Sequence, residues 1–394
     1  MDSRLQHGHR RKLGAPLVLV VALLVLSLGR GDLTLAAPSD APAGAPQADT
    51  LPPETCTFDD VTNTRTCELW ATTGTLDLPD ATSVPIWGYT DTAGSTASLP
   101  GPTIIANEGE TVEIILHNDL DDATAMVFPG QAMVPDLTGV PAGGDTTYSF
   151  TASSPGTYLY EAGLLPNAQH QVAMGLYGGL VVRPDLGATY AYSDTTTMFV
   201  DEALLVLSDI DPALNTSPDP TAFDMRDYAP TYFLINGQAY PETEEIPSLP
   251  GNRILLRTVN AGIVQHPLGV LGMHQEVIAT DGHPLSYPYQ VAAATIGSGQ
   301  TSDRIVTVPS DAGAAGDSRY AVYDTSMLLH NNGAPGYGGM LTFISVPDGA
   351  GIETGPITSA AEVAPNPTDG TVEVALTATI PGATEAEYFI DWVG

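Results

Sequence analysis

Histidine and cysteine are the residue types in this sequence that are best suited to bind a transition metal, because imidazole and thiolate are good ligands for copper and zinc. The chain has eight histidines and two cysteines. Its one pair of histidines two residues apart, His7 and His9, lies near the N-terminus. Met273 or Met340 could add a soft ligand to a site built from later histidines. Three of the later histidines are weak candidates for metal ligands: His266, His274 and His330.

A structural role for these three histidines is the alternative that we favour. His266 is then expected to cap a strand, His274 to lie on an exposed face, and His330 to lie in a loop rich in Asn and Gly. Two acidic runs, residues 119–122 and 209–211, offer oxygen ligands of the kind that calcium prefers. Because no EF-hand spacing is present, we favour solvated loops for both. The sequence therefore predicts no catalytic and no cofactor-binding residue.

The first 37 residues are typical of a secretory signal peptide. A basic cluster at residues 10–12 precedes an apolar run at residues 13–28, and small residues follow at 35–37. The alternative is an uncleaved N-terminal anchor, and in both cases the rest of the chain leaves the cytoplasm. We expect a secreted or extracellular protein, or one at the cell surface, with no membrane span after cleavage.

The charge of the chain excludes one class of partner. The formal net charge is −34, and Lys12 in the signal segment is the only lysine. Such a surface repels nucleic acid and anionic membranes. It suits an ion-rich exterior, where counterions screen self-repulsion, or it reflects a compositional drift toward Asp and Thr. We expect an extracellular or cell-surface partner and no nucleic acid, and the sequence indicates neither the identity of the partner nor the oligomeric state.

Cys56 and Cys67 are predicted to form a disulfide, because two nearby cysteines in an exported chain usually pair. Asn63 and Thr64 stand between them at a plausible hairpin turn. A metal-binding pair is the weaker alternative, since the spacing is long and no histidine lies near.

Strands, not helices, must position these residues. The chain has 40 glycines and 33 prolines, which suit short strands joined by turns. Asp281-Gly282 is a turn signal directly after one predicted strand. We predict strands at Thr111–Asn118, Thr146–Phe150, Gly156–Tyr160, Gly179–Val182, Thr196–Val200, Arg253–Val259, Glu276–Thr280, Arg304–Val308, Tyr320–Tyr323 and Met340–Val346.

Short strands at this spacing predict an all-β protein with two tandem β-sandwich domains. Linkers rich in Pro, Ala and Thr separate the parts, and two last strands, Thr371–Ile380 and Ala386–Ile390, are too few to bury a core. We therefore predict a stub of a further, immunoglobulin-like module. The expected boundaries are 1–37 signal peptide, 38–53 linker, 54–185 first domain, 186–347 second domain, 348–368 linker and 369–394 incomplete module.

Several motifs together resemble the multicopper oxidases, a family of linked cupredoxin sandwiches. In the first unit they are LPGPTIIANEGETV at 99–112, GTYLY at 156–160 and GLYGGLVV at 175–182. In the second unit they are INGQ at 235–238, LRTVNAG at 256–262, VIATDG at 277–282 and GGML at 338–341. The resemblance covers roughly residues 70–346 and implies two cupredoxin-like domains, with copper as a cofactor by resemblance only.

The same resemblance implies copper ligands that this sequence lacks. The first His-x-His motif should fall at residues 127–129 and the second at 161–163, where the sequence has Val-Phe-Pro and Glu-Ala-Gly. The motif His-Pro-x-His-x-His keeps only His266. The last motif, His-Cys-His, should lie between residues 323 and 332, which contain no cysteine. A blue copper site needs a cysteine thiolate, and no cysteine follows Cys67.

Glu161 and His170 are one remaining candidate pair. The resemblance places Glu161 where a copper-binding histidine would point toward the region between the domains, so the two side chains could do acid–base work. The alternative that we favour is a polar pair that satisfies an emptied copper cavity, with Gln169 and Gln171 in the same role.

These observations predict a secreted, multicopper-oxidase-like protein with degenerate copper sites and a non-catalytic binding or structural role at the cell surface. The alternative is a copper-dependent oxidoreductase with a divergent ligand set. Whether the chain is an enzyme is left open by the sequence, because the family framework is present and the ligand motifs are absent.

Overall fold

The computed structural model describes Leu51, residues 56–314, 316, 318–331, 333 and 335–347, and the backbone of two later strands. The predicted signal peptide lies outside these residues, as does the predicted linker 38–53 apart from Leu51. The predicted strand Ala386–Ile390 also lies outside them.

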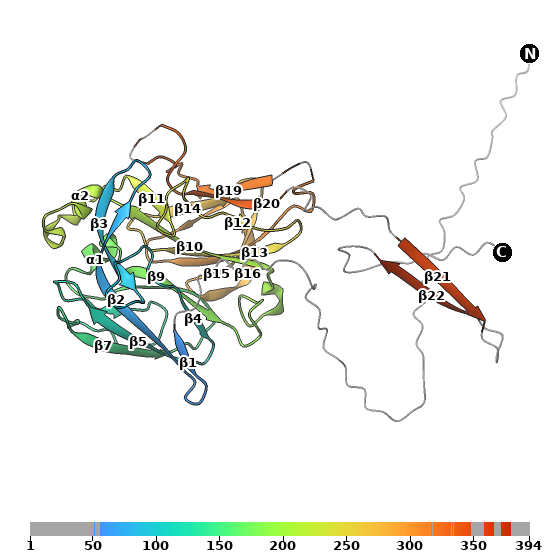
Figure 1. Cartoon of the computed structure of the whole chain (residues 1–394), viewed down its shortest axis with the longest axis horizontal. Coiled ribbons are helices and arrows are strands. Elements are labelled where there is room, and N and C mark those ends of the chain that lie inside the picture. Colours follow the sequence, from blue (N-terminus) through green and yellow to red (C-terminus); the bar gives the residue numbers. More distant parts are fainter. Residues whose placement is uncertain are drawn as a thin grey trace, which may run out of the picture. The chain divides into compact units, whose positions relative to one another are not determined.

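Two sheets form the first sandwich (Figure 1). One sheet has the order β1-β2-β5-β7, with β3 paired to β2, and the other has the order β4-β9-β8-β6. The pairs β2–β5 and β4–β9 are parallel and the other pairs are antiparallel. The strands are β1 (Thr57–Asp59), β2 (Thr64–Asp77), β3 (Ser83–Thr90), β4 (Ile104–Asn107), β5 (Thr111–Asn118), β6 (Met126–Val127), β7 (Asp145–Thr151), β8 (Gly156–Ala162) and β9 (Tyr177–Arg183).

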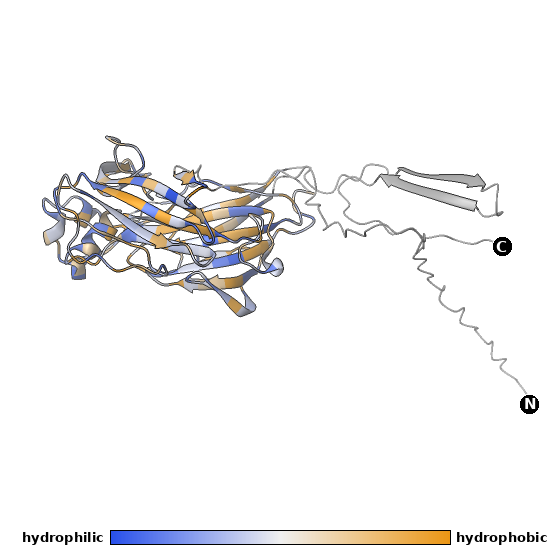
Figure 2. Ribbon diagram, turned by 90° about the horizontal axis from the view of Figure 1, so that it is seen from below, coloured by the Kyte–Doolittle hydropathy of each residue, from blue (hydrophilic) through white to orange (hydrophobic). Residues whose placement is uncertain are grey.

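Alternation along β5 places the core of this sandwich. Val112, Ile114 and Leu116 are fully buried, whereas Glu113 and His117 on the opposite face are half-buried. Side chains two apart on a strand share a face, so the apolar set of β5 meets that of the facing sheet. Figure 2 shows apolar and polar residues mixed along these ribbons.

The second sandwich contains a six-stranded sheet, β11-β10-β13-β18-β15-β16, and a five-stranded sheet, β12-β20-β19-β14-β17. Its apolar core is distinct from that of the first sandwich. Mixed sheets of this kind confirm the predicted all-β fold class. The strands are β10 (Asp201–Ile210), β11 (Tyr232–Ile235), β12 (Ile246–Pro247), β13 (Arg253–Asn260), β14 (His266–Val270), β15 (Gln275–Thr280), β16 (His283–Val291), β17 (Ala293–Ile296), β18 (Thr301–Thr307), β19 (Ser318–Asp324) and β20 (Leu341–Val346).

A third apolar cluster joins the two sandwiches. It combines residues of β3, β8 and β9 with residues of β10, β11 and β13. All ten residues of β10 are buried, and the five in its middle, Ala203 to Leu207, are apolar. Gly179 of β9 allows this close approach, since a Cβ there would lie 2.9 Å from a methyl carbon of Leu204.

The prediction of a strand at Thr196–Val200 was wrong. Residues Thr195–Thr197 form a short 3₁₀ helix, η1, because the Asp194 carboxylate accepts a hydrogen bond from the backbone N–H of Thr196 and caps the turn. The strand begins instead at Asp201.

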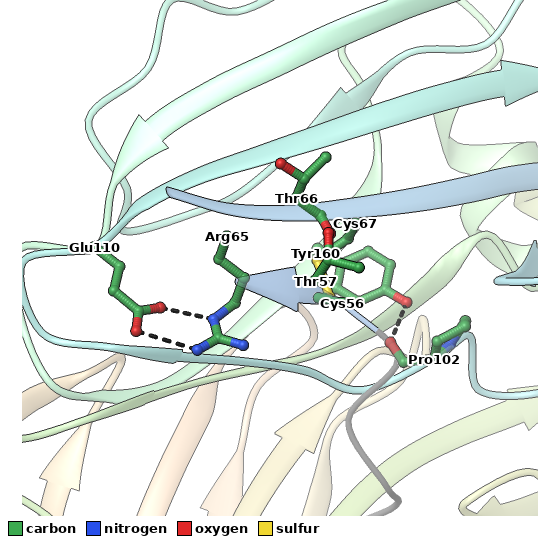
Figure 3. Close-up of a disulfide and its surroundings, with 8 residues drawn as sticks. All are labelled: Cys56, Thr57, Arg65, Thr66, Cys67, Pro102, Glu110 and Tyr160. Carbon is green, nitrogen blue, oxygen red and sulfur yellow. Dashed lines mark hydrogen bonds and ion pairs between the residues drawn. A yellow bond between two sulfur atoms is a disulfide. The ribbon is translucent and has the colours of Figure 1, made fainter. Parts of the chain in front are cut away.

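Two predicted turns are confirmed. Asn63 has a φ of 52° and turns the chain from β1 into β2, and Asp281 and Gly282, with φ of 51° and 71°, turn it from β15 into β16. Positive φ is tolerated best by Asn, Asp and Gly. Next to the first turn a disulfide joins Cys56 and Cys67, and Arg65 forms a forked pair with Glu110 (Figure 3).

The linker predicted at 348–368 contains a strand. Strand β21 (Thr358–Pro365) pairs antiparallel with β22 (Val372–Thr379), so the hairpin begins earlier in the chain than we predicted. The few helices are short: α1 (Ala168–Met174), α2 (Pro212–Asn215), η1, η2 (Pro220–Ala222) and η3 (Met225–Asp227). None in the described part of the chain has the length and apolar character needed to cross a membrane.

Candidate functional site

The two positions that begin the expected His-x-His motifs of the first sandwich lie side by side. Strand β6 pairs with β8, and Val127 is the register partner of Glu161. Residues directly opposite on an antiparallel pair have neighbouring side chains. The fold therefore brings the two motif positions together, with an isopropyl group and a carboxylate in place of two imidazoles.

The second position of the later motif has no room for a side chain. A Cβ added to Gly163 would lie 2.7 Å from the Cβ of Ala125, and the backbone N–H of Gly163 donates to the carbonyl of Ala125. An imidazole at this position would require the backbone to move. Phe128, between the two positions of the first motif, packs into the core against Phe150 with ring centroids 4.9 Å apart.

Glu161 is a half-buried carboxyl group beside Val127. Burial raises the pKa of Glu161 to about 7. Among the described residues no hydrogen bond or ion pair to its side chain is found. An ordinary exposed glutamate is ionised at this pH, whereas the protonation of Glu161 changes near neutrality.

The structure does not bring Glu161 and His170 together. His170 lies in α1, and its Nε2 is 2.8 Å from the carbonyl oxygen of Phe223, while no carboxylate of a described residue lies within ion-pair distance of it. Gln171 of the same helix is buried, and its amide bonds the hydroxyl of Thr124 and the carbonyl of Ala123. The acid–base pair that the sequence suggested is therefore not formed in this structure.

His266 lies in a buried acidic environment in the second sandwich. Its Nδ1 is 2.7 Å from Oδ2 of Asp324, and its Nε2 is 3.7 Å from Oδ2 of Asp209, with all three side chains inaccessible to solvent. Burial alone would lower the pKa of His266, but the two carboxylates outweigh it and the pKa is raised. Asp209, expected in a solvated loop, instead ends a buried strand and accepts hydrogen bonds from Tyr228 and Val264.

The three histidine candidates do not meet. His266 is buried, whereas His274 and His330 are exposed. Within the part of the chain that the structure describes, no three His, Cys, Asp or Glu side chains gather in a way that could hold a metal ion. Gly269, where the resemblance implies a histidine, is packed so that a Cβ would lie 2.6 Å from Cγ2 of Thr325.

A second buried cluster connects the sandwiches. Arg257 of β13 is fully buried and donates to Glu202 of β10 at 2.5 Å, and its Nη1 lies 3.4 Å from Asp303 of β18. From the first sandwich, Thr157 donates its hydroxyl to Asp303 at 2.6 Å, and Arg183 binds Glu202 through a fork. Each sandwich thus supplies partners for charges of the other.

The charges of this cluster hold one another ionised. Burial alone would raise the pKa of Glu202, but Arg257 and Arg183 outweigh it and lower the pKa below its usual value. Burial alone would likewise lower the pKa of Arg257, and Glu202 and Asp303 raise it. The arrangement is a structural ion network, because the side chains of Arg257, Glu202 and Asp303 are enclosed and satisfy one another's charge.

Comparison with known proteins decides the family. Two sequence profiles, each described as multicopper oxidase, match residues 80–186 and 209–349, which together make up more than half of the chain. The chain belongs to the multicopper oxidase family.

Relatives in this family are 25–30% identical to the chain over the matched residues. The multicopper oxidase MmcO of Mycobacterium tuberculosis is 29% identical over 247 residues, which cover 53% of this chain and 46% of the relative. Copper resistance protein A of Pseudomonas syringae pv. tomato is 26% identical over 276 residues, covering 58% of this chain and 43% of the relative. The chain therefore spans a little less than half the length of these two relatives.

Solved structures of multicopper oxidases have the same fold. The blue copper oxidase from Nitrosomonas europaea superposes with a TM-score of 0.61 and 22% identity, covering 72% of this chain and 86% of that one. The copper nitrite reductase from the same organism gives a TM-score of 0.56 and 21% identity, covering 72% and 94%. These likenesses confirm the cupredoxin fold of both sandwiches.

Sequence reasoning missed the residues of the buried network in this family member. Arg257, Glu202 and Asp303 are charged, and charged residues are usually exposed. One signal could have revealed them: Arg257 interrupts a strand of buried apolar residues, and its register partner on β18 is Asp303. A charge in the middle of such a strand requires a buried partner of opposite sign.

Proposed function

We propose that this member of the multicopper oxidase family is a secreted or cell-surface protein with a non-catalytic binding or structural role. Its two sandwiches keep the cupredoxin framework and do not assemble the copper centres of the family. The proposed location rests on the signal-like segment at residues 1–37, and the proposed partner is an extracellular molecule that is not a nucleic acid.

One observation carries the proposal: the donor atoms at the motif positions do not suit copper. The strand pair β6–β8 brings Val127 beside Glu161, and the packing of Gly163 against Ala125 leaves no room for a ring. One carboxylate takes the place of the imidazoles that this family uses. Copper in proteins is bound mainly by imidazole and sulfur ligands, so the group does not fit here and we derive no step through it.

The thiolate of a blue copper site has no source in the sandwiches either. Both cysteines are used in the disulfide between Cys56 and Cys67, which lies at the start of the first sandwich. In the second sandwich, the one buried histidine of the candidates, His266, is already bound to Asp324. These facts support a role in which the framework is kept for its shape and stability.

Metal loading of the purified chain tests this proposal. The chain is incubated with Cu(I) and with Cu(II), dialysed against a weak chelator, and its copper measured by mass spectrometry together with electron paramagnetic resonance and oxygen consumption on a phenol. We expect no stoichiometric copper and no oxygen consumption, with a laccase loaded in parallel as the positive control.

A matched variant removes copper bound by chance at the surface. His283→Ala deletes one exposed imidazole that lies outside all the expected motif regions. Any copper that disappears in this variant is superficial. Copper that persists in stoichiometric amount with oxidation of the phenol would establish the alternative, a copper-dependent oxidoreductase with a divergent ligand set.

A further inference from the structure

A cavity of about 340 Å³ opens on the six-stranded sheet of the second sandwich, and His274 and Met273 are among its lining residues. Its polar lining comes from a row of cross-strand partners. Arg253 on β13 is opposite Thr307 on β18, and Glu276 on β15 is opposite Gln290 on β16. Cross-strand partners share a face of the sheet, so these four side chains lie along one surface.

The floor of the cavity is apolar and its rim is polar. Met273 and Ile305 are buried, and His274 at the rim is exposed. The side chains of Arg253 and Glu276 are 32% and 39% exposed, so both are accessible to a ligand. Concave sites with a few convergent polar groups over an apolar base are the usual form of small-molecule sites.

Arg253 differs from the other arginines of this acidic chain. Its guanidinium donates to the carbonyl of Thr196 at 3.0 Å, and the nearest carboxylate, that of Glu276, lies 3.9 Å away, beyond hydrogen-bond distance. Arg304 instead bonds Gln275 and backbone carbonyls. The remaining arginines in the described residues each hydrogen-bond a carboxylate: Arg65, Arg183, Arg226, Arg257 and Arg319.

We propose that this cavity binds a small organic acid that carries hydrogen-bond donors beside its carboxylate. A guanidinium presents its donors as a planar fork that fits a carboxylate, and Arg253 has donors left for such a contact. Glu276 then accepts from the hydroxyl or ammonium donors of the ligand, and the amide of Gln290 can donate or accept. Uronic acids and free amino acids both have this chemistry.

The proposal does not depend on copper, because Arg253, Glu276 and Gln290 lie outside the copper motif positions. A net charge of −34 repels anions at long range, so binding of an acid requires a local positive group, and Arg253 is the one at this cavity. Salt screens both the repulsion by the net charge and the attraction by Arg253, so the salt concentration is held constant in the test.

Isothermal titration calorimetry of the whole chain with D-glucuronate and with L-alanine tests the proposal, with D-glucose as the neutral control. We expect at least one of the acids to bind about tenfold or more tightly than glucose. Arg253→Gln abolishes the difference, Arg253→Lys restores part of it, and Arg226→Gln, which removes an exposed arginine elsewhere, leaves it unchanged.

The Glu276→Gln variant separates the two sources of the ligand chemistry. If the native chain binds alanine and Glu276→Gln does not, the ligand is an amino acid, since an ammonium needs the carboxylate. If the native chain binds glucuronate but not alanine, and Glu276→Gln still binds glucuronate, the ligand is a uronic acid. Urea unfolding of each variant verifies that the fold is intact. Equal affinity of the native chain and Arg253→Gln for the acids, or no binding of either acid, overturns the proposal.

Discussion

Two regions of this molecule bury carboxylates to different extents and with different partners. At the contact between the sandwiches, Glu202 and Asp303 face the buried guanidinium of Arg257, and the pKa of Glu202 is lowered. On the strand pair β6–β8, the half-buried Glu161 faces Val127, no described residue pairs with its carboxylate, and its pKa is raised to about 7. A glutamate is therefore kept ionised by its arginine partners in one region, and in the other a glutamate takes up a proton near pH 7.

The difference shows what the chain stabilises. The interface cluster receives hydrogen bonds from both sandwiches, so it fixes how the two units pack in addition to the apolar contacts around Leu204. The positions that serve copper in the family carry an uncompensated carboxyl and packed glycines. In this chain, paired charges stabilise the contact between the sandwiches, whereas the motif region gains no such stabilisation from Glu161.

Removing Arg257 should have the largest effect. Arg257→Met leaves Glu202 and Asp303 buried without their shared cation, and breaking one partner of a buried ion network costs about 3–5 kcal/mol. The free energy of unfolding in urea measures it. The triple variant with Glu202→Gln and Asp303→Asn should recover part of the loss, and a cost of Arg257→Met below about 1 kcal/mol would remove the distinction between the two regions.

Replacing Glu161 should stabilise the protein, and only at higher pH. A carboxyl whose pKa rises from 4.5 in the unfolded chain to about 7 in the folded one binds its proton more tightly when folded. Stability is therefore lost as the pH rises from 4.5 through 7 and stays lower above that. Glu161→Gln should gain about 2 kcal/mol at pH 8.5 and almost nothing at pH 4.5, after allowance for partial exposure.

Urea unfolding at both pH values measures this gain, with Glu113→Gln as the control on the half-buried face of β5. The gain of Glu161→Gln between the two pH values is measured relative to this control. A pH-independent effect of Glu161→Gln would mean that the carboxyl has a partner or reaches solvent, and the contrast with the interface would then fail.

Thr157 measures the link between the sandwiches itself. Thr157→Val keeps the shape of the side chain and deletes the hydroxyl that donates to Asp303 and accepts from Arg257. Loss of a buried hydrogen bond to a charged group costs about 1.5 kcal/mol. Thr151→Val, at the exposed end of β7, is the matched control for the substitution. Equal unfolding midpoints for Thr157→Val and the native chain would show that the hydroxyl does not tie the units together.

The sequence predicts the periodic parts of this fold and misses the parts decided by long-range pairing. Strand β5 and the turn at Asp281 follow from local alternation and turn chemistry, and both are present. The burial of Asp209 does not follow, because its short acidic segment looks solvated until Tyr228 and the backbone of Val264 arrive from elsewhere in the chain. The pairing of Glu161 with His170 failed because α1 points His170 toward the carbonyl of Phe223.

An exposed ion pair provides the lower limit of the comparison. Arg226 pairs with Asp224, but the arginine side chain is 89% exposed, and exposed pairs of this kind contribute little to stability. Arg226→Gln should leave the urea midpoint of unfolding nearly unchanged, and added salt should reduce any change further because exposed charges are screened. Unfolding in urea at low and high ionic strength checks both expectations. If Arg226→Gln cost as much as Arg257→Met, enclosure from water would not be what distinguishes the interface network.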